Sequence, residues 1–382
     1  KILEISVIGV DEDFFDLGGD SLKVISLSVA IQKRFGAEIG ISDIFQLRTV
    51  RKIGRKIDET GVPGRQSILP VPEASSYDVS PSQKRLFLLR QIDGEGINYN
   101  LPAAVEIRGP LSAPALSAAF AKMIDRHESL RTSFSLIDGA PVQIINPQAA
   151  FRIPERQADE KELPLIMKEF VRPFDLGTAP LLRAELITLG AERHVLLIDM
   201  HHIISDGESV NILEREFAAL YSGGELPEIR NQYKDYSAWQ NARLSAGDLK
   251  REEEYWLGKF EGEVPVLNLP TDHARPSRKS FRGSRTSISL NSETVSGIKD
   301  MAAHSRATIF MVLYTAFHIL LSRYSGQDDI VVGIPVVGRR HPDTLDLIGM
   351  FVNTLAVRSN PAWDKTFAAF LDEVRSDLLG AY

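Results

Sequence analysis

The sequence contains no cysteine in its 382 residues. This absence excludes disulfide scaffolds, thiol catalysis and cysteine-ligated metal sites, and it fits a reducing compartment. No apolar run approaches the ~20 residues that a membrane span needs. The chain begins at Lys1 without Met or a signal-peptide pattern, so we interpret it as a segment of a longer cytoplasmic protein. The net charge of −7 argues against nucleic acid or an anionic membrane as a partner.

The composition is that of a folded protein with several domains. Apolar residues make up 43% and charged residues 25% of the chain, close to the average for globular proteins. At roughly 100–200 residues per domain, the length predicts two to four domains. Residues 1–60 indicate a small helical unit, and residues 61–76, rich in proline and glycine, indicate a linker. From residue 77 onward helices and strands alternate, in two similar halves that we place at 77–260 and 261–382.

Hydrophobic periodicity predicts the elements of each half. In the first half we expect strands at 102–108, 131–136, 142–146, 181–189 and 193–202, and helices at 111–129, 207–221 and within 234–260. The strand that ends at His202 is almost continuously apolar and is expected to be buried on both faces. In the second half we expect strands at 285–290, 329–337 and 351–358, and helices at 292–304, 308–324 and 364–380.

The first motif is Asp16-Leu17-Gly18-Gly19-Asp20-Ser21. The two glycines allow a sharp turn, and Ser21 then begins a helix, whose positive end suits a phosphodiester. In a bare Gly-Gly-x-Ser string, Asp20 or Ser21 more often simply caps a helix. The longer string Asp13-Phe14-Phe15 to Leu22 resembles the phosphopantetheine-attachment segment of peptidyl carrier proteins. The resemblance implies that Ser21 carries 4′-phosphopantetheine and that most of the first carrier helix is missing here.

The second motif is His201-His202-Ile203-Ile204-Ser205-Asp206-Gly207, at the end of a buried strand. Alternation along a strand directs His202 and His201 to opposite sides, so the pair is a poor chelate and we predict no metal site. Asp206 is placed to cap the following helix or to pair with an arginine, and Gly207 leaves room beside the backbone.

This string resembles the HHxxxDG signature of condensation domains in nonribosomal peptide synthetases. Four further segments resemble condensation-domain motifs in the family's order, at 80–87, 126–134, 233–239 and 348–354. The resemblance implies an α/β fold like that of chloramphenicol acetyltransferase, with two similar lobes arranged as a V-shaped pseudo-dimer. Two later family motifs have no counterpart, so we expect the second lobe to be incomplete.

Together the two resemblances imply a carrier–condensation didomain from a synthetase of the tyrocidine and gramicidin type. The implied reaction is amide-bond formation between a donor thioester and the free amine of an acceptor thioester, each bound to a carrier. His202 is the acid/base or positioning group, and His201 and Asp206 support it. The implied partners are upstream and downstream carrier, adenylation and condensation domains and a phosphopantetheinyl transferase.

Four arginines accompany the motifs. We expect Arg126 and Arg131, at a helix-to-strand junction, to hold carboxylates in place rather than to act in catalysis. Arg339 and Arg340 follow an expected strand and are candidates to pair with Asp206.

Two alternatives stay open. A carrier–epimerisation didomain would also contain HHxxxDG, and Asp20 before the serine is frequent in carriers that serve epimerisation. The segments at 126–132 and 349–354 match condensation rather than epimerisation. A catalytically silent docking or recruiting module is the third reading, and the intact His202 and Asp206 argue against it.

Overall fold

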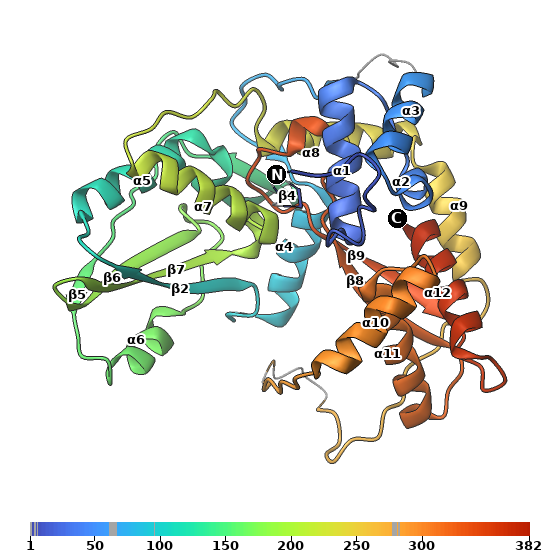
Figure 1. The fold of residues 1–382 in the computed structure, drawn as a ribbon. Helices are drawn as coiled ribbons and strands as arrows, with labels where there is room; N and C mark the ends of the chain where they lie inside the picture. Colours follow the sequence, from blue (N-terminus) through green and yellow to red (C-terminus); the bar gives the residue numbers. More distant parts are fainter. Residues whose placement is uncertain are drawn as a thin grey trace. The chain divides into compact units, whose positions relative to one another are not determined.

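The computed structural model describes residues 2–3, 5, 7–60, 67–94, 96–276, 281 and 283–382, and only the backbone of Ser21 and Leu22. The chain divides into two compact units (Figure 1). One consists of Lys1–Gln66, Lys250–Pro342 and Asn353–Tyr382, and the other of Ser67–Leu249 and Asp343–Val352. The domain limits proposed from the sequence stay predictions, and part of the expected linker, 61–66, lies outside the described residues.

The N-terminal helical segment contains α1 (Ser21–Phe35), α2 (Ile41–Leu47) and α3 (Val50–Thr60). The loop before α1 is ordered by Asp13, which accepts a hydrogen bond from the Phe15 backbone (2.8 Å) and forms an ion pair with Arg48 at the end of α2. The guanidinium of Arg48 lies 4.6 Å from the ring centre of Phe15, which stacks on Phe45 of α2 at 4.8 Å. The acidic and aromatic residues of the motif therefore join its loop to α2.

The two glycines of this motif are needed for different physical reasons. Gly18 has a φ of +89°, a conformation that side chains disfavour. Gly19 has an ordinary φ, but a Cβ there would lie 2.3 Å from the Phe14 ring and 2.5 Å from the Phe14 carbonyl oxygen. The loop is thus closed tightly enough to exclude even a methyl group next to the helix start.

The second unit is built on a four-stranded sheet in the order β2-β7-β6-β5. Its elements are β1 (Tyr77–Asp78), α4 (Pro81–Asp93), β2 (Asn100–Arg108), α5 (Ala113–Arg126), the 3-10 turn Glu128–Arg131, β3 (Thr132–Ile137), β4 (Ala140–Ile145), β5 (Glu155–Gln157), α6 (Leu163–Phe170), β6 (Leu182–Gly190), β7 (Arg193–His201), the 3-10 turn His202–Ile204, α7 (Gly207–Tyr221) and α8 (Tyr233–Ala246). Strands β1, β4 and β3 form a smaller sheet.

Strand β7 is covered on both faces, as its apolar sequence predicts. Leu196 and Met200 belong to the cluster that includes residues of α5 and α7. Val195 and Leu197 face the other way and pack with Ile166 of α6. Figure 1 shows α5 and α7 on one side of the sheet and α6 on the other. Burial on both faces makes the end of β7 a rigid base for the residues that follow it.

The remaining part of the first unit contains α9 (Lys250–Lys259), α10 (Ser292–His304), α11 (Ile309–Ser325), β8 (Ile330–Val336), β9 (Asn353–Ser359) and α12 (Phe367–Ala381). A further 3-10 turn spans Pro342–Thr344. Strands β8 and β9 pair antiparallel. The expected helices and the last two expected strands are confirmed, but the strand expected at 285–290 is wrong, because these residues form no regular structure.

Among the described helices, none is by itself long and apolar enough to cross a membrane. The pair α10 and α11 meets the same length-and-composition test only when taken together, and it is bent by 105° at the break.

We expect Gly19→Ala to destabilise the N-terminal segment by about 1–3 kcal/mol, the usual cost of overpacking, because the added methyl group overlaps the Phe14 ring. Denaturant unfolding, followed by a probe in this segment, measures the change.

The matched control is Gly54→Ala in α3, where a Cβ meets nothing within 4 Å. There alanine should be neutral or should stabilise the helix by about 0.5–1 kcal/mol. Equal effects of the two substitutions would contradict the steric account of Gly19.

Candidate active site

The HHxxxDG segment follows β7 directly. His201 is the last residue of the strand, His202–Ile204 form a 3-10 turn, and α7 begins at Gly207 with Asp206 as its N-cap. The connection between β7 and α7 is short and both elements are well packed, so the residues from His202 to Asp206 have little conformational freedom.

His201 is buried, with 2% of its surface exposed. Its Nδ1 accepts a hydrogen bond from the Ile203 backbone N–H (3.1 Å), which places the ring proton on Nε2. The rings of Tyr99 and Phe174 lie 6.2 Å from its ring centre. Burial first, and then the charges of Arg90 and His202, lower the pKa of His201 to about 3. His201 is therefore a neutral residue that fixes the loop.

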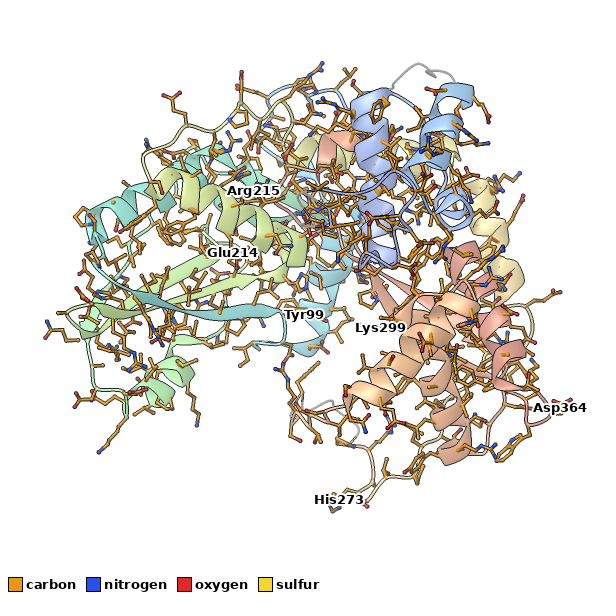
Figure 2. All side chains as sticks on the ribbon, viewed as in Figure 1. Tyr99, Glu214, Arg215, His273, Lys299 and Asp364 are labelled. Atoms are coloured by element: carbon orange, nitrogen blue, oxygen red, sulfur yellow. The ribbon has the colours of Figure 1, made fainter. Side chains whose placement is uncertain are left out.

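His202 is held in the opposite tautomer. Its Nδ1 lies 2.8 Å from the carbonyl oxygen of Ser205, and a carbonyl can only accept, so Nδ1 carries the proton. Its backbone N–H donates to the carbonyl oxygen of Tyr99 (2.7 Å), the residue labelled at the entry to β2 in Figure 2. Nε2 of His202 is left as the basic nitrogen, able to accept a proton or a hydrogen bond.

Asp206 connects the loop to two other segments. Its Oδ1 accepts hydrogen bonds from the backbone N–H (2.8 Å) and the hydroxyl (2.7 Å) of Ser209. Its Oδ2 accepts from the backbone N–H of Phe351 (3.0 Å). The predicted helix cap is confirmed, and a Cβ at Gly207 would meet nothing within 4 Å.

Residues 343–352, which we call the crossover segment, are held beside this loop by several further contacts. The backbone N–H of Gly349 donates to the Ser209 hydroxyl oxygen (3.1 Å), whose own proton is donated to Asp206. The Tyr233 hydroxyl donates to the Met350 carbonyl (2.6 Å) and lies 2.8 Å from the Ser80 hydroxyl. A Cβ at Gly349 would lie 1.9 Å from the Tyr233 ring, so this position requires glycine. The motifs at 80–87, 233–239 and 348–354 are thus connected to one another, and the last of them contacts Asp206 of the HHxxxDG segment.

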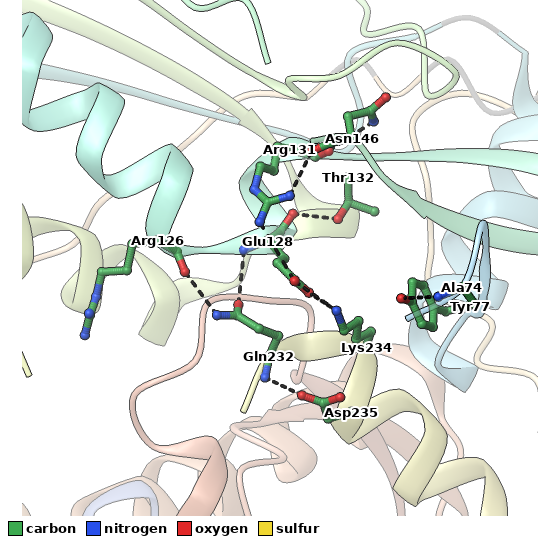
Figure 3. A network of polar contacts seen from close by, with 10 residues as sticks. All are labelled: Ala74, Tyr77, Arg126, Glu128, Arg131, Thr132, Asn146, Gln232, Lys234 and Asp235. Carbon is green, nitrogen blue, oxygen red and sulfur yellow. Dashed lines mark hydrogen bonds and ion pairs between the residues drawn. The ribbon is translucent and has the colours of Figure 1, made fainter. Parts of the chain in front are cut away.

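The fourth motif supports α8 and α7. Figure 3 shows Glu128, whose carboxylate accepts a hydrogen bond from Lys234 of α8 (2.9 Å). The side chain of Gln232 joins the two segments, because it donates to the Arg126 carbonyl (3.0 Å) and accepts from the Glu128 N–H (3.1 Å). The motif therefore fixes the start of α8, which carries Tyr233.

The two arginines of this motif contact carboxylates, as expected. Nε of Arg126 lies 3.0 Å from Glu216 of α7, which also binds the buried His127 at 2.7 Å. Arg131 donates to the Asn146 carbonyl (2.8 Å) and lies 3.8 Å from Glu128. Their role as supports of the site stays a prediction.

The other predicted site residues lie in the first unit. Ser21 is the first residue of α1, and Asp20 caps that helix by accepting from the Lys23 N–H (2.8 Å). Arg339, after β8, is 2% exposed. The pairing of Arg339 or Arg340 with Asp206 would join the two units, and it stays a prediction.

Comparison with protein families matches both parts of the chain. The family described as "Condensation domain" matches residues 73–382, and "Phosphopantetheine attachment site" matches residues 1–57. The chain belongs to the condensation-domain family. This condensation-domain chain begins with a carrier domain of the nonribosomal peptide synthetase type, for which phosphopantetheine is the cofactor.

Curated relatives are much longer. Gramicidin S synthase 2 of Brevibacillus brevis is 43% identical over 381 residues, and tyrocidine synthase 3 of Brevibacillus parabrevis is 44% identical over 382 residues. Each match covers 100% of this chain, but only 9% and 6% of the respective relatives. The carrier–condensation didomain is therefore a small part of the length of these synthetases.

Solved structures share the fold. The X-domain of teicoplanin biosynthesis has a TM-score of 0.75 at 27% identity, covering 83% of this chain and 73% of that one. An X-domain has also been solved in complex with OxyB, with a TM-score of 0.73 at 28% identity, covering 84% of this chain and 74% of that one. The four-domain synthetase holo-AB3403 has a TM-score of 0.72 at 22% identity, covering 82% and 24%. The expected condensation-domain fold is confirmed.

Sequence reasoning identified the signature but not the residues that fix it. The Ser205 carbonyl, which sets the His202 tautomer, and the fit of Gly349 against Tyr233 depend on backbone geometry that motifs do not encode. The sequence does mark Asp199 as a residue with a special role, since it is the one carboxylate in the apolar stretch 195–200 of this strand.

We expect the ring resonances of His201 to stay constant between about pH 8 and pH 4.5, because burial keeps the imidazole neutral. An unfolded histidine has a pKa of about 6.5, so the unfolded chain binds this proton first. His201 therefore lowers the stability of the fold as the pH falls from about 6.5 towards 3.

Two-dimensional NMR of histidine-labelled chain measures the titration, with His201→Gln to assign the signals. A titration midpoint between about pH 6 and pH 7, the range of an unperturbed histidine, would overturn this account of His201.

Proposed function

We propose that this chain tethers an acyl group on its carrier domain and catalyses amide-bond formation in nonribosomal peptide synthesis. The observation that carries the proposal is the tautomer of His202, whose Nδ1–H binds the Ser205 carbonyl and whose Nε2 is left basic. Membership of the condensation-domain family supplies the reaction class.

The carrier domain has residues that fit the cofactor. Gly18 and Gly19 keep side chains away from the turn before Ser21, and Asp20 rather than Ser21 caps the helix. Ser21 would hold the phosphodiester at the positive end of α1. Phosphopantetheine, when bound there, supplies a thiol that carries the acyl group.

In the condensation step, His202 Nε2 would accept a hydrogen bond from the attacking amine and orient it towards the donor carbonyl. The new C–N bond forms as the C–S bond breaks, and the proton lost by the amine ends on the departing thiol. An α-amino group has a pKa of about 7.7–8.0, so roughly a tenth to a sixth of it is already neutral near pH 7, and the attack needs no strong base. We therefore assign His202 positioning together with shared proton transfer.

The remaining roles follow from contacts. His201, Asp206 and Gly207 would hold the loop of His202, and Arg126 and Arg131 would support α7 and α8. The partners would be neighbouring carrier, adenylation and condensation domains and a phosphopantetheinyl transferase, all in the cytoplasm.

A recruiting function is the second candidate, because the X-domain that resembles this chain has been solved with a partner protein. Epimerisation is the third. The three candidates can be told apart by what happens to the same loaded carrier.

We expect His202→Ala to lower the rate of dipeptide formation by about 10²-fold, within the usual range for a positioned acid/base group. The assay uses the full-length protein with aminoacyl-loaded Ser21 and a loaded acceptor carrier, followed by mass spectrometry. The control is His304→Ala, at an exposed helix end, which should retain full activity.

Undiminished dipeptide formation by His202→Ala would show that His202 neither positions the amine nor transfers its proton. A racemised thioester without dipeptide would instead indicate epimerisation, and loaded carrier without either product would indicate a recruiting module.

Ser21→Ala should abolish loading. Intact-mass analysis after treatment with coenzyme A and a phosphopantetheinyl transferase should show one added arm on the unaltered chain and none on Ser21→Ala. The exposed Ser42→Ala in α2 is the control and should be loaded normally. Loading of Ser21→Ala would refute the attachment site.

A further inference from the structure

Three polar side chains lie close together on the face of the sheet that α6 covers. Asn100 of β2, Asp199 of β7 and Arg183 of β6 come from adjacent strands, and Arg183 is the direct cross-strand partner of Asp199. Alternation puts Asp199 on the same face as Leu197 and Val195, which pack against α6. It also puts Asp199 on the same face as His201, two residues further along.

Asp199 is fully buried, and its charge is incompletely compensated. Its Oδ2 accepts a hydrogen bond from Asn100 Nδ2 (2.6 Å) and lies 3.7 Å from Nε of Arg183. Its Oδ1 is buried without a hydrogen-bond partner among the described residues. Burial raises the pKa of the Asp199 carboxyl, and burial lowers the pKa of Arg183 to about 10.

Such a pair is a poor source of stability. The desolvation of two buried charges commonly offsets their attraction, and apolar replacements of both are often neutral or stabilising. A role other than stability is therefore needed to explain why a carboxylate interrupts an apolar strand.

The same two partners of Asp199 also hold the segment between α6 and β6. In residues 171–176, which we call the strap, the Arg172 carbonyl accepts from Asn100 Nδ2 (2.9 Å). The Pro173 carbonyl accepts from Arg183 Nη2 (3.2 Å). Asp199 thus orients both side chains that bind the strap to the sheet.

Phe174 of the strap contacts both Arg183 and His201 of the signature. The guanidinium of Arg183 lies 3.6 Å from the centre of the Phe174 ring. The Phe174 ring also lies edge-to-face with His201, at 6.2 Å and 89°. Arg90 of α4 donates to the Phe174 carbonyl (3.2 Å) and fixes the backbone at this point. A continuous series of contacts therefore connects Asp199 to the residue before His202.

We propose that Asp199 is a positioning residue: with Asn100 and Arg183 it clamps the strap so that Phe174 fixes His201 and, through it, the catalytic orientation of His202. The inference rests on the proposed condensation function. It assigns to Asp199 and Arg183 no contact with substrate.

The test measures steady-state dipeptide formation by the full-length protein. Asp199→Asn keeps the size of the side chain and removes its charge. We expect kcat to fall about 10–100-fold with KM changed less than about threefold, since an interaction used only in the transition state is weakened.

The decisive variant combines Asp199→Asn with His202→Ala. If Asp199 acts through His202, the double variant should be no more than about threefold slower than His202→Ala alone, because groups that act as a unit are strongly non-additive. A multiplicative loss would overturn the inference.

A second pair of variants separates positioning from folding. Asp199→Asn combined with Arg183→Met removes both charges and should unfold at a denaturant midpoint at least as high as Asp199→Asn alone. Its kcat should stay low because the strap has lost its donor. Recovery of kcat together with stability would refute the inference.

Phe174→Leu serves if the charge variants fail to fold, because it keeps the clamp and removes the ring beside His201. It should show the same fall in kcat and the same non-additivity with His202→Ala, and an unchanged kcat would overturn the inference. The control is Glu106→Gln, which removes a carboxylate paired with Arg193 at the far end of the same sheet (2.7 Å) and should keep kcat within about twofold, as surface ion pairs contribute little.

These outcomes distinguish the two proposals. If the unaltered protein forms no dipeptide, the proposed function fails. If His202→Ala is impaired while Asp199→Asn is not, the function stands and the inference about Asp199 fails.

Discussion

The buried carboxylate of Asp206 is the contact on which the geometry of the signature depends. One of its oxygens holds the first turn of α7 through Ser209, and the other holds the backbone of Phe351, from a segment about 145 residues away in sequence. A buried charge must be satisfied by donors on every side, so the loop from His202 to Asp206 can close in only a narrow set of conformations. The Ser205 carbonyl, which fixes the His202 tautomer, belongs to this loop.

The family motifs therefore have a common physical purpose in this unit. The Tyr233 hydroxyl forms hydrogen bonds with Ser80 and with the Met350 carbonyl, and the Tyr233 ring packs against Gly349. Glu128 fixes the start of the helix that carries Tyr233. Each motif reads in the sequence as a separate short string. In the structure they form one arrangement that brings the crossover segment to the HHxxxDG loop.

Local signals predicted most of the fold. The helix 207–221 was predicted at its observed limits because an N-cap aspartate and a glycine mark its start. Asp138 and Gly139, between β3 and β4, both adopt positive φ, as an Asp-Gly hairpin turn requires. The strand at 285–290 was predicted wrongly from its alternating pattern. In the structure Ile288 and Leu290 are 85% and 49% exposed. A strand forms only where a second strand pairs with it, and a local pattern does not show whether such a partner exists. The site shows the same division: the signature residues could be read from the sequence, whereas the partners that orient them come from distant segments.

The two adjacent histidines illustrate why burial matters as much as identity. A protonated His201 would place a positive charge beside His202 and disfavour any proton that His202 takes up. Burial keeps His201 neutral over the whole physiological range. The proton accepted by His202 Nε2 therefore meets no positive charge on the adjacent histidine, and the hydrogen bond from Nδ1–H to the Ser205 carbonyl strengthens as the ring gains charge. The two histidines thus have complementary roles: the first is buried and neutral, and the second is partly exposed. Their exposure differs because His201 ends β7 and His202 begins the 3-10 turn.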